Sequence, residues 1–409
     1  MTHSSKLYSQ QSAGPGDGAQ PLHHDGSRMS ISRAIAVAFT VTAALGIGLA
    51  AQTPLRTLDA AELKRTIEQG LTAVPRGYER LSSPAQAGVR VRDVQVDRLP
   101  SSQRVTIDLS QKALTFDPGG DVELVLDQVI RSTAPLTGNT GDVQYQFLVD
   151  GLPLDLFVPR AEARFAARAA GKPRVVVSGG HGYYWNEHYS DWRLQRDHYW
   201  GIVEDVVNWE FAADVQAALR NTTFDARPAR NPDPLSRPGP SGHPGWQEGA
   251  VYFVRGLGAP GNVWNIGVND YARDINSRPF YANWIGADLV VSIHNNGGGG
   301  TGSETWFDET NGYQGESRRL AETLNTHIVR AIRRFYNADW PDRGLRSCNG
   351  CKGENRLAAS PAVILEIAFM DMKTPDNAAL HDPAFKRIVA YAIRDGLHSW
   401  AGLPIPSED

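Results

Sequence analysis

The sequence predicts an α/β protein with a mixed, mostly parallel sheet flanked by helices, preceded by a smaller α/β region. Two observations support this fold class. Short apolar runs alternate with longer stretches of helical periodicity through the second half of the chain, which is typical of a sheet covered on both faces. Apolar residues make up 41% and charged residues 21% of the 409 residues. This is the composition of a globular protein, and the chain is long enough for two domains.

The start of the chain predicts export. Residues 1–33 are polar and form a predicted cytoplasmic tail, whereas residues 34–51 are apolar and carry no charge. Their length lies between the apolar core of a signal peptide, about 7–15 residues, and a membrane span of about 20 residues. Basic residues precede this run, so we expect a signal peptide or a membrane anchor. The rest of the chain is then expected to be extracytoplasmic, in the periplasm, in the cell wall or secreted, and either released from the membrane or anchored to it.

Residues 52–160 are predicted to form a small α/β accessory domain. Four of its segments have helical or strand-like periodicity: 58–71, 105–109, 122–132 and 145–151. The motifs VTIDLS at 105–110 and FLVDG at 147–151 resemble the small domain of spore-germination proteins. No cluster of metal-binding residues stands out here, so we expect a role in binding or spacing. Residues 161–171 are a predicted connector.

Residues 172–405 are predicted to form a second domain, built from alternating strands and helices. The apolar runs favour strands at 175–177, 251–254, 289–293 and 362–367. The helical periodicities favour helices at 202–220, 270–285, 317–335 and 385–400. Pro279 lies inside the second of these helices and is expected to kink or restart it.

Three titratable residues lie at the ends of predicted strands. His181 follows the strand 175–177 and His294 ends the strand 289–293, while Glu366 ends the strand 362–365. Sites in open α/β sheets form at the carboxyl ends of strands. Two histidines and a carboxylate suit a catalytic zinc ion, which needs three ligands and an open position. A further carboxylate near the open position would act as base. The helix 202–220 offers four carboxylates as the third ligand: Glu204, Asp205, Glu210 and Asp214.

The motifs from residue 173 to 402 resemble the zinc-dependent N-acetylmuramoyl-L-alanine amidases of the type 3 family. They are GHG at 180–182, EDVVN at 204–208, ADLVVSIHNN at 287–296, DRG at 342–344 and PAVILEIAF at 361–369. The resemblance implies one zinc ion per chain, held by His181, Glu204 and His294, with Glu366 as the catalytic residue. The implied substrate is peptidoglycan, cut at the amide between N-acetylmuramic acid and L-alanine.

The sequence departs from the family pattern between the first histidine and the helix. The interval from His181 to Glu204 is longer than usual, and residues 183–200 are rich in aromatic side chains and histidine. Glu187 or Glu210 could therefore replace Glu204 as a ligand, and His188 or His198 could add one. The aromatic insert is either a self-packed loop or a rim that contacts sugar or peptide.

The remaining features limit the other functions. The formal net charge of −4 gives no sign of a nucleic-acid partner. Cys348 and Cys351 are the two cysteines of the chain, and export favours a local disulfide between them. Two alternative functions stay open: a non-catalytic cell-wall binding protein derived from an amidase, and a related zinc carboxypeptidase.

Overall fold

A computed structural model describes residues 56–75, 79, 82–116, 122–138, 140–161 and 171–407. The chain divides into two units, Met1–Thr53 and Pro54–Asp409, and the described residues belong to the second. The predicted tail at 1–33, the apolar run at 34–51 and most of the connector at 161–171 lie outside the described residues. Within the described ranges, no helix is both long and apolar enough to cross a bilayer.

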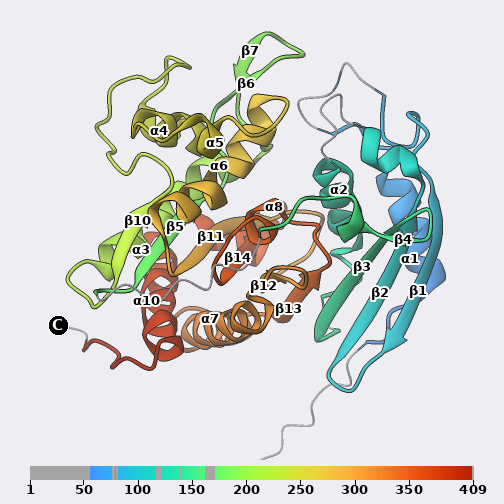
Figure 1. Cartoon of the computed structure of the whole chain (residues 1–409). Coiled ribbons are helices and arrows are strands. Elements are labelled where there is room, and N and C mark those ends of the chain that lie inside the picture. Colours follow the sequence, from blue (N-terminus) through green and yellow to red (C-terminus); the bar gives the residue numbers. More distant parts are fainter. Residues whose placement is uncertain are drawn as a thin grey trace, which may run out of the picture. The chain divides into compact units, whose positions relative to one another are not determined.

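One ten-stranded sheet forms the centre of the second unit (Figure 1). Nine strands follow the order β1-β2-β3-β13-β12-β14-β11-β5-β10, and β4 pairs with β3 outside this path. Their bounds are β1 Val91–Arg98, β2 Ser102–Leu109, β3 Asp142–Val149, β4 Leu152–Pro153, β5 Arg174–Gly179, β10 Asp225–Pro228, β11 Leu289–Asn296, β12 Ser303–Asp308, β13 Asp342–Cys348 and β14 Ala362–Phe369.

Most neighbouring strands run parallel, which confirms the predicted fold class. The antiparallel pairs are β1 with β2, β3 with β4, and β12 with β14. The three strands that carry the predicted site residues, β5, β11 and β14, are adjacent and parallel. In their register, Ile293 lies opposite Gly179 and His294 lies opposite Glu366. The carboxyl ends of these strands therefore meet at one edge of the sheet.

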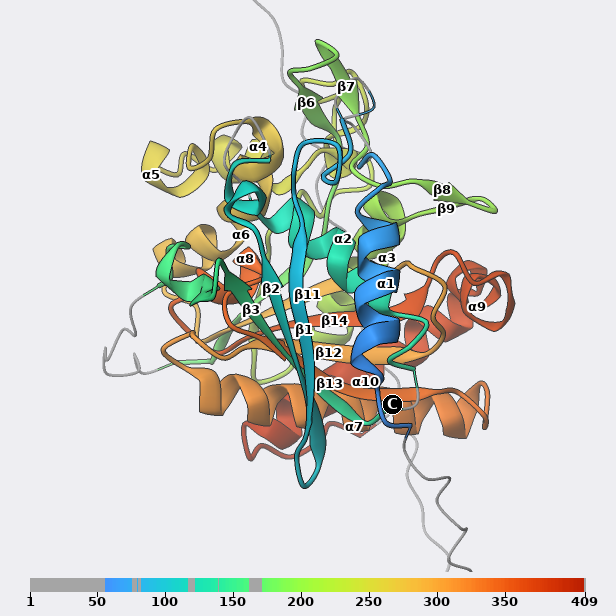
Figure 2. The same ribbon diagram turned by 90° about the vertical axis from the view of Figure 1, so that its right-hand side faces the viewer.

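Helices cover both faces of the sheet (Figures 1 and 2). The apolar side chains of α3, α7 and α10 form one core with alternate residues of the central strands, among them Val177, Val291 and Leu365. The opposite face is covered by two groups of elements. Side chains of α4, α5 and α6 pack on Val176 and Val290, and those of α1 and α2 pack near the other end of the sheet. The helices are α1 Ala60–Gly70, α2 Glu123–Thr133, α3 Glu204–Leu219, α4 Ala250–Gly256, α5 Gly261–Trp264, α6 Asp270–Ile285, α7 Gln314–Phe335, α8 Gly353–Arg356, α9 Ala378–His381 and α10 Pro383–Trp400.

Local sequence signals set several helix ends. Asp59 precedes α1, and its side chain accepts a hydrogen bond from the backbone nitrogen of Glu62 at 2.7 Å. Asn269 caps α6 in the same way, and Gly286 ends that helix with φ of 65°, a conformation that favours glycine. The helix α6 continues through Pro279 as one element from Asp270 to Ile285.

The sheet does not stop at the predicted boundary between the accessory region and the second domain. β3 pairs in parallel with β13 through Arg346, Ser347 and Cys348. The core around α1 and α2 also includes Trp306 and Ile364 from β12 and β14. The described residues of the two regions thus share one sheet and one of the buried clusters, whereas the sequence pattern indicated two separate units, 52–160 and 172–405. The strand β13 was not predicted because its sequence DRGLRSC lacks an apolar alternation.

Two further features bear on the sequence predictions. Residues 251–254, predicted as a strand, lie in the helix α4, because a short apolar run has no period that separates the two states. Cys348 at the end of β13 forms a disulfide with Cys351, as predicted for an exported chain.

Candidate metal centre

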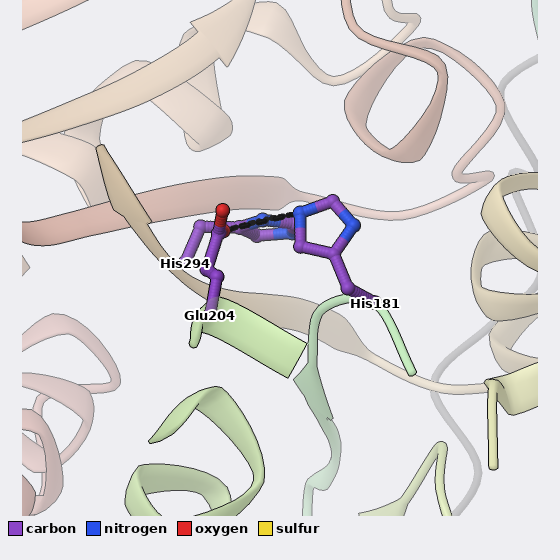
Figure 3. A group of neighbouring side chains, drawn as sticks. All are labelled: His181, Glu204 and His294. Atoms are coloured by element: carbon purple, nitrogen blue, oxygen red, sulfur yellow. Dashed lines mark hydrogen bonds and ion pairs between the residues drawn. The ribbon is translucent and has the colours of Figure 1, made fainter. Parts of the chain in front are cut away.

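Three side chains from different elements meet on the face of the sheet that α6 and α2 cover. His181 follows β5, Glu204 begins α3 and His294 lies in β11 (Figure 3). Nδ1 of His294 lies 3.1 Å from Nε2 of His181 and 3.0 Å from Oε1 of Glu204. Nε2 of His181 lies 3.1 Å from the same oxygen. The three atoms therefore form a nearly equilateral triangle.

This triangle fits a zinc site. Ligand atoms of a tetrahedral zinc ion with bonds near 2.0–2.1 Å lie about 3.3 Å apart. Imidazole nitrogen and carboxylate oxygen are the ligand atoms that catalytic zinc sites use. All three residues are buried, and among the described residues this is the group of histidine and acidic side chains whose ligand atoms lie within 4.8 Å of one another. The residues thus have the number, chemistry and spacing of a three-ligand metal centre.

The backbone around His181 brings the histidines together. His181 has φ of 68°, in the left-handed region that residues with a side chain rarely adopt. A Cβ atom on the preceding Gly180 would lie 2.1 Å from Cε1 of His294. Glycine at this position therefore permits the close approach of the ring. Gly298, in the loop after β11, permits another close approach, because a Cβ there would lie 2.2 Å from the carbonyl oxygen of Arg131 in α2.

Hydrogen-bond donors hold the carboxylate of Glu204 so that its Oε1 atom faces both histidines. Asn208 donates to this oxygen from Nδ2 at 3.1 Å, and the backbone nitrogen of Asn295 donates at 3.2 Å. Nδ2 of Asn295 in turn donates to Oδ1 of Asn208 at 2.8 Å. The asparagine four residues after Glu204 therefore orients the carboxylate, which gives the spacing noted in the sequence a structural reason.

The ring nitrogen of each histidine that faces away from the triangle, here called the outer nitrogen, also has a partner. Nε2 of His294 lies 3.0 Å from Oε1 of Glu354, and Nδ1 of His181 lies 2.9 Å from Oε1 of Gln195. Burial lowers the pKa of His294, but the carboxylates of Glu354 and Glu204 outweigh it and raise that pKa to about 9. The space between His294 and Glu204 therefore favours a positive charge, whether a proton or a metal ion.

Glu366 lies beside the triangle, opposite His294 on the neighbouring strand. Its carboxyl group is buried, and its Oε2 atom has no hydrogen-bond partner among the described residues. Burial, together with the negative charge of Glu204, raises the pKa of Glu366 to about 8. Such a carboxyl group can gain and lose a proton near neutral pH, which is what a general acid–base residue requires.

A small cavity joins these residues. Its volume is about 60 Å³, room for about two water molecules. Part of its wall comes from α2 of the predicted accessory region, which contributes Glu123, Asp127 and Arg131. Asp127 makes ion pairs with Lys352 at 3.1 Å and with Arg196 at 3.8 Å. The region 52–160 therefore takes part in the site. Sequence reasoning missed this, because Glu123, Asp127 and Arg131 lie four residues apart and have the pattern of a solvated helix face.

The structure does not bring the alternative ligands to the triangle. Glu210 forms an ion pair with Lys386, and Glu187 is exposed, with Oε1 4.0 Å from Arg273. In the part of the chain that the structure describes, neither His188 nor His198 joins the metal-binding group.

The aromatic insert forms two short hairpins, β6 (Tyr184–Asn186) with β7 (Asp191–Arg193), and β8 (His198–Tyr199) with β9 (Ile202–Val203). Its rings pack on one another and on neighbouring helices. Trp185 lies 5.7 Å from Trp192, whose ring is 5.2 Å from Tyr252, and Tyr184 lies 5.6 Å from Tyr271. These contacts agree with the self-packed alternative. Trp200 is half exposed, and its ring lies 6.3 Å from that of Tyr199.

The α/β fold and the buried His–Glu–His cluster are those of a protein with a candidate metal site at the edge of a mostly parallel sheet. Residues 175–399 match the N-acetylmuramoyl-L-alanine amidase family. This range is more than half of the chain, and the chain belongs to that family.

Two curated relatives match the chain over 129 residues, which is 32% of its length. The sporulation-specific N-acetylmuramoyl-L-alanine amidase of Bacillus subtilis (strain 168) is 30% identical, with 46% of that protein covered. The N-acetylmuramoyl-L-alanine amidase CwlM of Bacillus licheniformis is 31% identical, with 47% covered. The chain thus spans about half the length of the curated relatives it matches.

Similar solved structures include amidases. The catalytic domain of CwlV from Bacillus (Paenibacillus) polymyxa var. colistinus is 19% identical, with a TM-score of 0.37, and the match covers 57% of this chain and 99% of that one. Ami1 from Mycobacterium smegmatis is 17% identical, with a TM-score of 0.40, and the match covers 57% and 98%.

Proposed function

We propose that this protein is a zinc-dependent N-acetylmuramoyl-L-alanine amidase that hydrolyses peptidoglycan. The observation that carries the proposal is the triangle of His181, Glu204 and His294, with edges of 3.0–3.1 Å, in a chain of this family. These three residues would hold one zinc ion. The bond cut would be the amide between N-acetylmuramic acid and the L-alanine of the stem peptide, which is the bond that the names of the curated relatives describe.

The chemistry divides between the metal and the chain. A bound zinc ion supplies Lewis-acid chemistry, since it polarises a carbonyl group and lowers the pKa of water to about 7. Glu366 supplies the proton transfers. Its unpaired Oε2 atom would take a proton from the attacking water, and the protonated carboxyl group would then donate this proton to the departing amide nitrogen.

The substrate and the disulfide support a location outside the cytoplasm. Peptidoglycan lies outside the cytoplasmic membrane, and disulfides such as Cys348–Cys351 are typical of oxidising compartments. The apolar run at 34–51 would direct export, as a cleaved signal peptide or as an anchor.

Mass analysis of the products from purified peptidoglycan tests the function. Digests are run with the purified protein alone, with a chelator, and with the chelator followed by excess zinc. We expect free stem peptides that begin with L-alanine, loss of activity with the chelator and recovery with zinc. Loss of a terminal amino acid from an otherwise attached stem would identify a carboxypeptidase. No product in any arm, with wall fragments still bound, would identify a binding protein.

A further inference from the structure

The outer nitrogens of the two histidines belong to one buried hydrogen-bonded network. We propose that Gln195, Asp274, Arg278 and Glu354 are positioning residues, which together set the ring orientation and the tautomer of His181 and His294. This inference rests on the metal site of the proposed function. It assigns a role to four residues outside the His–Glu–His triangle.

The His294 end of the network is set by a carboxylate. Oε1 of Glu354 lies 3.0 Å from Nε2 of His294, and both side chains are buried. An ionised carboxylate only accepts hydrogen bonds, so the neutral ring must carry its hydrogen on Nε2. The lone pair is then on Nδ1, the atom that faces Glu204 and His181. Carboxylate partners of this kind orient metal-binding histidines and increase their basicity.

The His181 end is set by an amide whose orientation is itself fixed. Nε2 of Gln195 donates to Oδ2 of Asp274 at 2.8 Å, and a carboxylate cannot serve as the donor in that contact. The other end of the amide, Oε1, must therefore face Nδ1 of His181, 2.9 Å away. Since Oε1 only accepts, Nδ1 carries the hydrogen and the lone pair lies on Nε2. Both rings thus present a lone pair toward Oε1 of Glu204.

Arg278 joins the two ends. Its guanidinium group donates to Asp274 and to Glu354, and all three side chains are buried. Asp274 and Arg278 lie one turn apart on α6, and Glu354 lies on α8. Arg278 thus links the two carboxylates that act on the histidines, Glu354 directly and Asp274 through the amide of Gln195. Such partners hold a metal-binding ring in one orientation.

The network also explains part of the long interval between the first histidine and α3. Gln195 follows the hairpin β6–β7 in that interval. Its backbone nitrogen donates to Oδ1 of Asp205 at 2.7 Å, and the same oxygen accepts from the backbone nitrogen of Gly182 at 2.9 Å. The insert therefore returns to the metal centre at Gln195, where it contributes the amide that holds His181.

Zinc affinity measured by competition with a chromophoric chelator tests the proposal. The variants are Glu354→Gln, Gln195→Met and the double variant, in the full chain. We expect each single variant to bind zinc about 10–100-fold more weakly than the parent protein. If the residues act as one unit, the loss in the double variant will be smaller than the product of the two single losses.

The matched control is Glu304→Gln. Glu304 is also buried, lies on the same face of the sheet and forms ion pairs with two arginines, but it does not contact the triangle. This variant should lose stability and retain its zinc affinity. A role of the network in stability alone would give Glu354→Gln the same result as the control, and such a result would overturn the inference. The Gln195→Met variant keeps the test decisive if Glu354→Gln fails to fold.

Two further readouts separate the inference from the proposed function. With cobalt in place of zinc, the visible spectrum of Gln195→Met should differ from that of the parent protein, because the His181 ring of the variant can turn. Cleavage of peptidoglycan by the parent protein is measured in parallel. Zinc binding without cleavage would refute the proposed function and leave the inference in place. Cleavage with unchanged zinc affinity in both single variants would refute the inference alone, and a parent protein that binds no zinc would refute both.

Discussion

At the scale of single residues, the site separates the groups that would hold the metal from the group that would move protons. His181, Glu204 and His294 present their ligand atoms to one another, whereas Glu366 has an unpaired oxygen beside them. The pKa of Glu366 is raised to about 8, mainly because the carboxyl group is buried. Substitution of a triangle residue is therefore expected to reduce metal binding, whereas substitution of Glu366 is expected to reduce catalysis.

The substitution Glu366→Gln tests the role of the proton-transfer group. The amide keeps the size of the side chain but cannot accept a proton from water. We expect kcat to fall by about 10²–10⁴-fold, the usual contribution of a general acid–base residue. Zinc content, measured by atomic emission, should remain at the parent level. Cleavage near the parental rate would show that another group is the base.

The substitution Gly180→Ala tests the close approach of the two histidine motifs. An added methyl group would lie 2.1 Å from Cε1 of His294, so the ring must turn away from the triangle. We expect a marked loss of zinc affinity in a folded protein. Gly256→Ala is the control, because its added Cβ has no neighbouring heavy atom within 4 Å. Equal zinc affinities in the two variants would contradict the argument.

The sequence predicts the main residues of the candidate site but not the residues that orient them. The sequence predicts His181, His294 and Glu366 at one edge of the sheet because each follows or ends an apolar strand. In the structure His181 follows β5, whereas His294 and Glu366 lie within the adjacent parallel strands β11 and β14, which continue to Asn296 and Phe369. Gln195 and Glu354 could not be found in this way. A glutamine in a loop and a glutamate in a four-residue helix have no periodicity, and their role depends on contacts with residues 14 and 60 positions away.

At the scale of secondary-structure elements, a buried ion-pair cluster connects α2 to the central strands. Glu304 of β12 accepts a hydrogen bond from Nε of Arg343 at 2.6 Å, and Nε of Arg346 lies 3.3 Å from the same carboxylate oxygen. Arg343 also donates to the carbonyl oxygen of Ala134 and to the hydroxyl of Thr137, just after α2. The cluster thus stabilises the segment that forms one wall of the cavity.

The substitution Glu304→Gln should lower the free energy of unfolding by about 3–5 kcal/mol, because it leaves two buried guanidinium groups without a counter-charge. Burial raises the pKa of Glu304, but the two arginines outweigh it and lower the pKa to about 2, from an ordinary value of 4.5. A depressed carboxyl pKa contributes stability above pH 4.5 that is lost as the pH falls toward 2.

Urea unfolding at several pH values measures both effects. The difference between parent and variant should be largest above pH 4.5 and should shrink by about 3 kcal/mol toward pH 2. A difference that stays constant over this range would show that the charge of Glu304 is not responsible.

At the scale of the whole second unit, the sheet extends from the strands of the metal centre into the predicted accessory region. Sequence periodicity identified α1, α2, β2 and β3 but not their partners. The pairing of β3 with β13 involves residues about 200 positions apart, and β13 has charged and polar residues at most of its positions. Periodicity within a segment therefore predicts the element but not the sheet edge on which it lies.

Removal of residues 1–170 tests whether the remaining chain is stable alone. The deletion would expose the edge of β13 and uncover Trp306 and Ile364, which are now in the core with α1 and α2. We expect the fragment 171–409 to aggregate or to unfold at a much lower temperature than the full chain, as followed by circular dichroism and light scattering. A fragment with the thermal midpoint of the parent protein would instead support an independent second domain.

The pairing of His294 with Glu366 across β11 and β14 has a consequence for the quality of any preparation of this protein. Successive side chains of a strand point to opposite faces, so a slip of β14 by one residue would place Leu365 or Ile367 beside His294. Such molecules would keep all three ligand residues and bind zinc, yet would lack the base. Under the proposed function, turnover per bound zinc ion would fall as the share of such molecules rises.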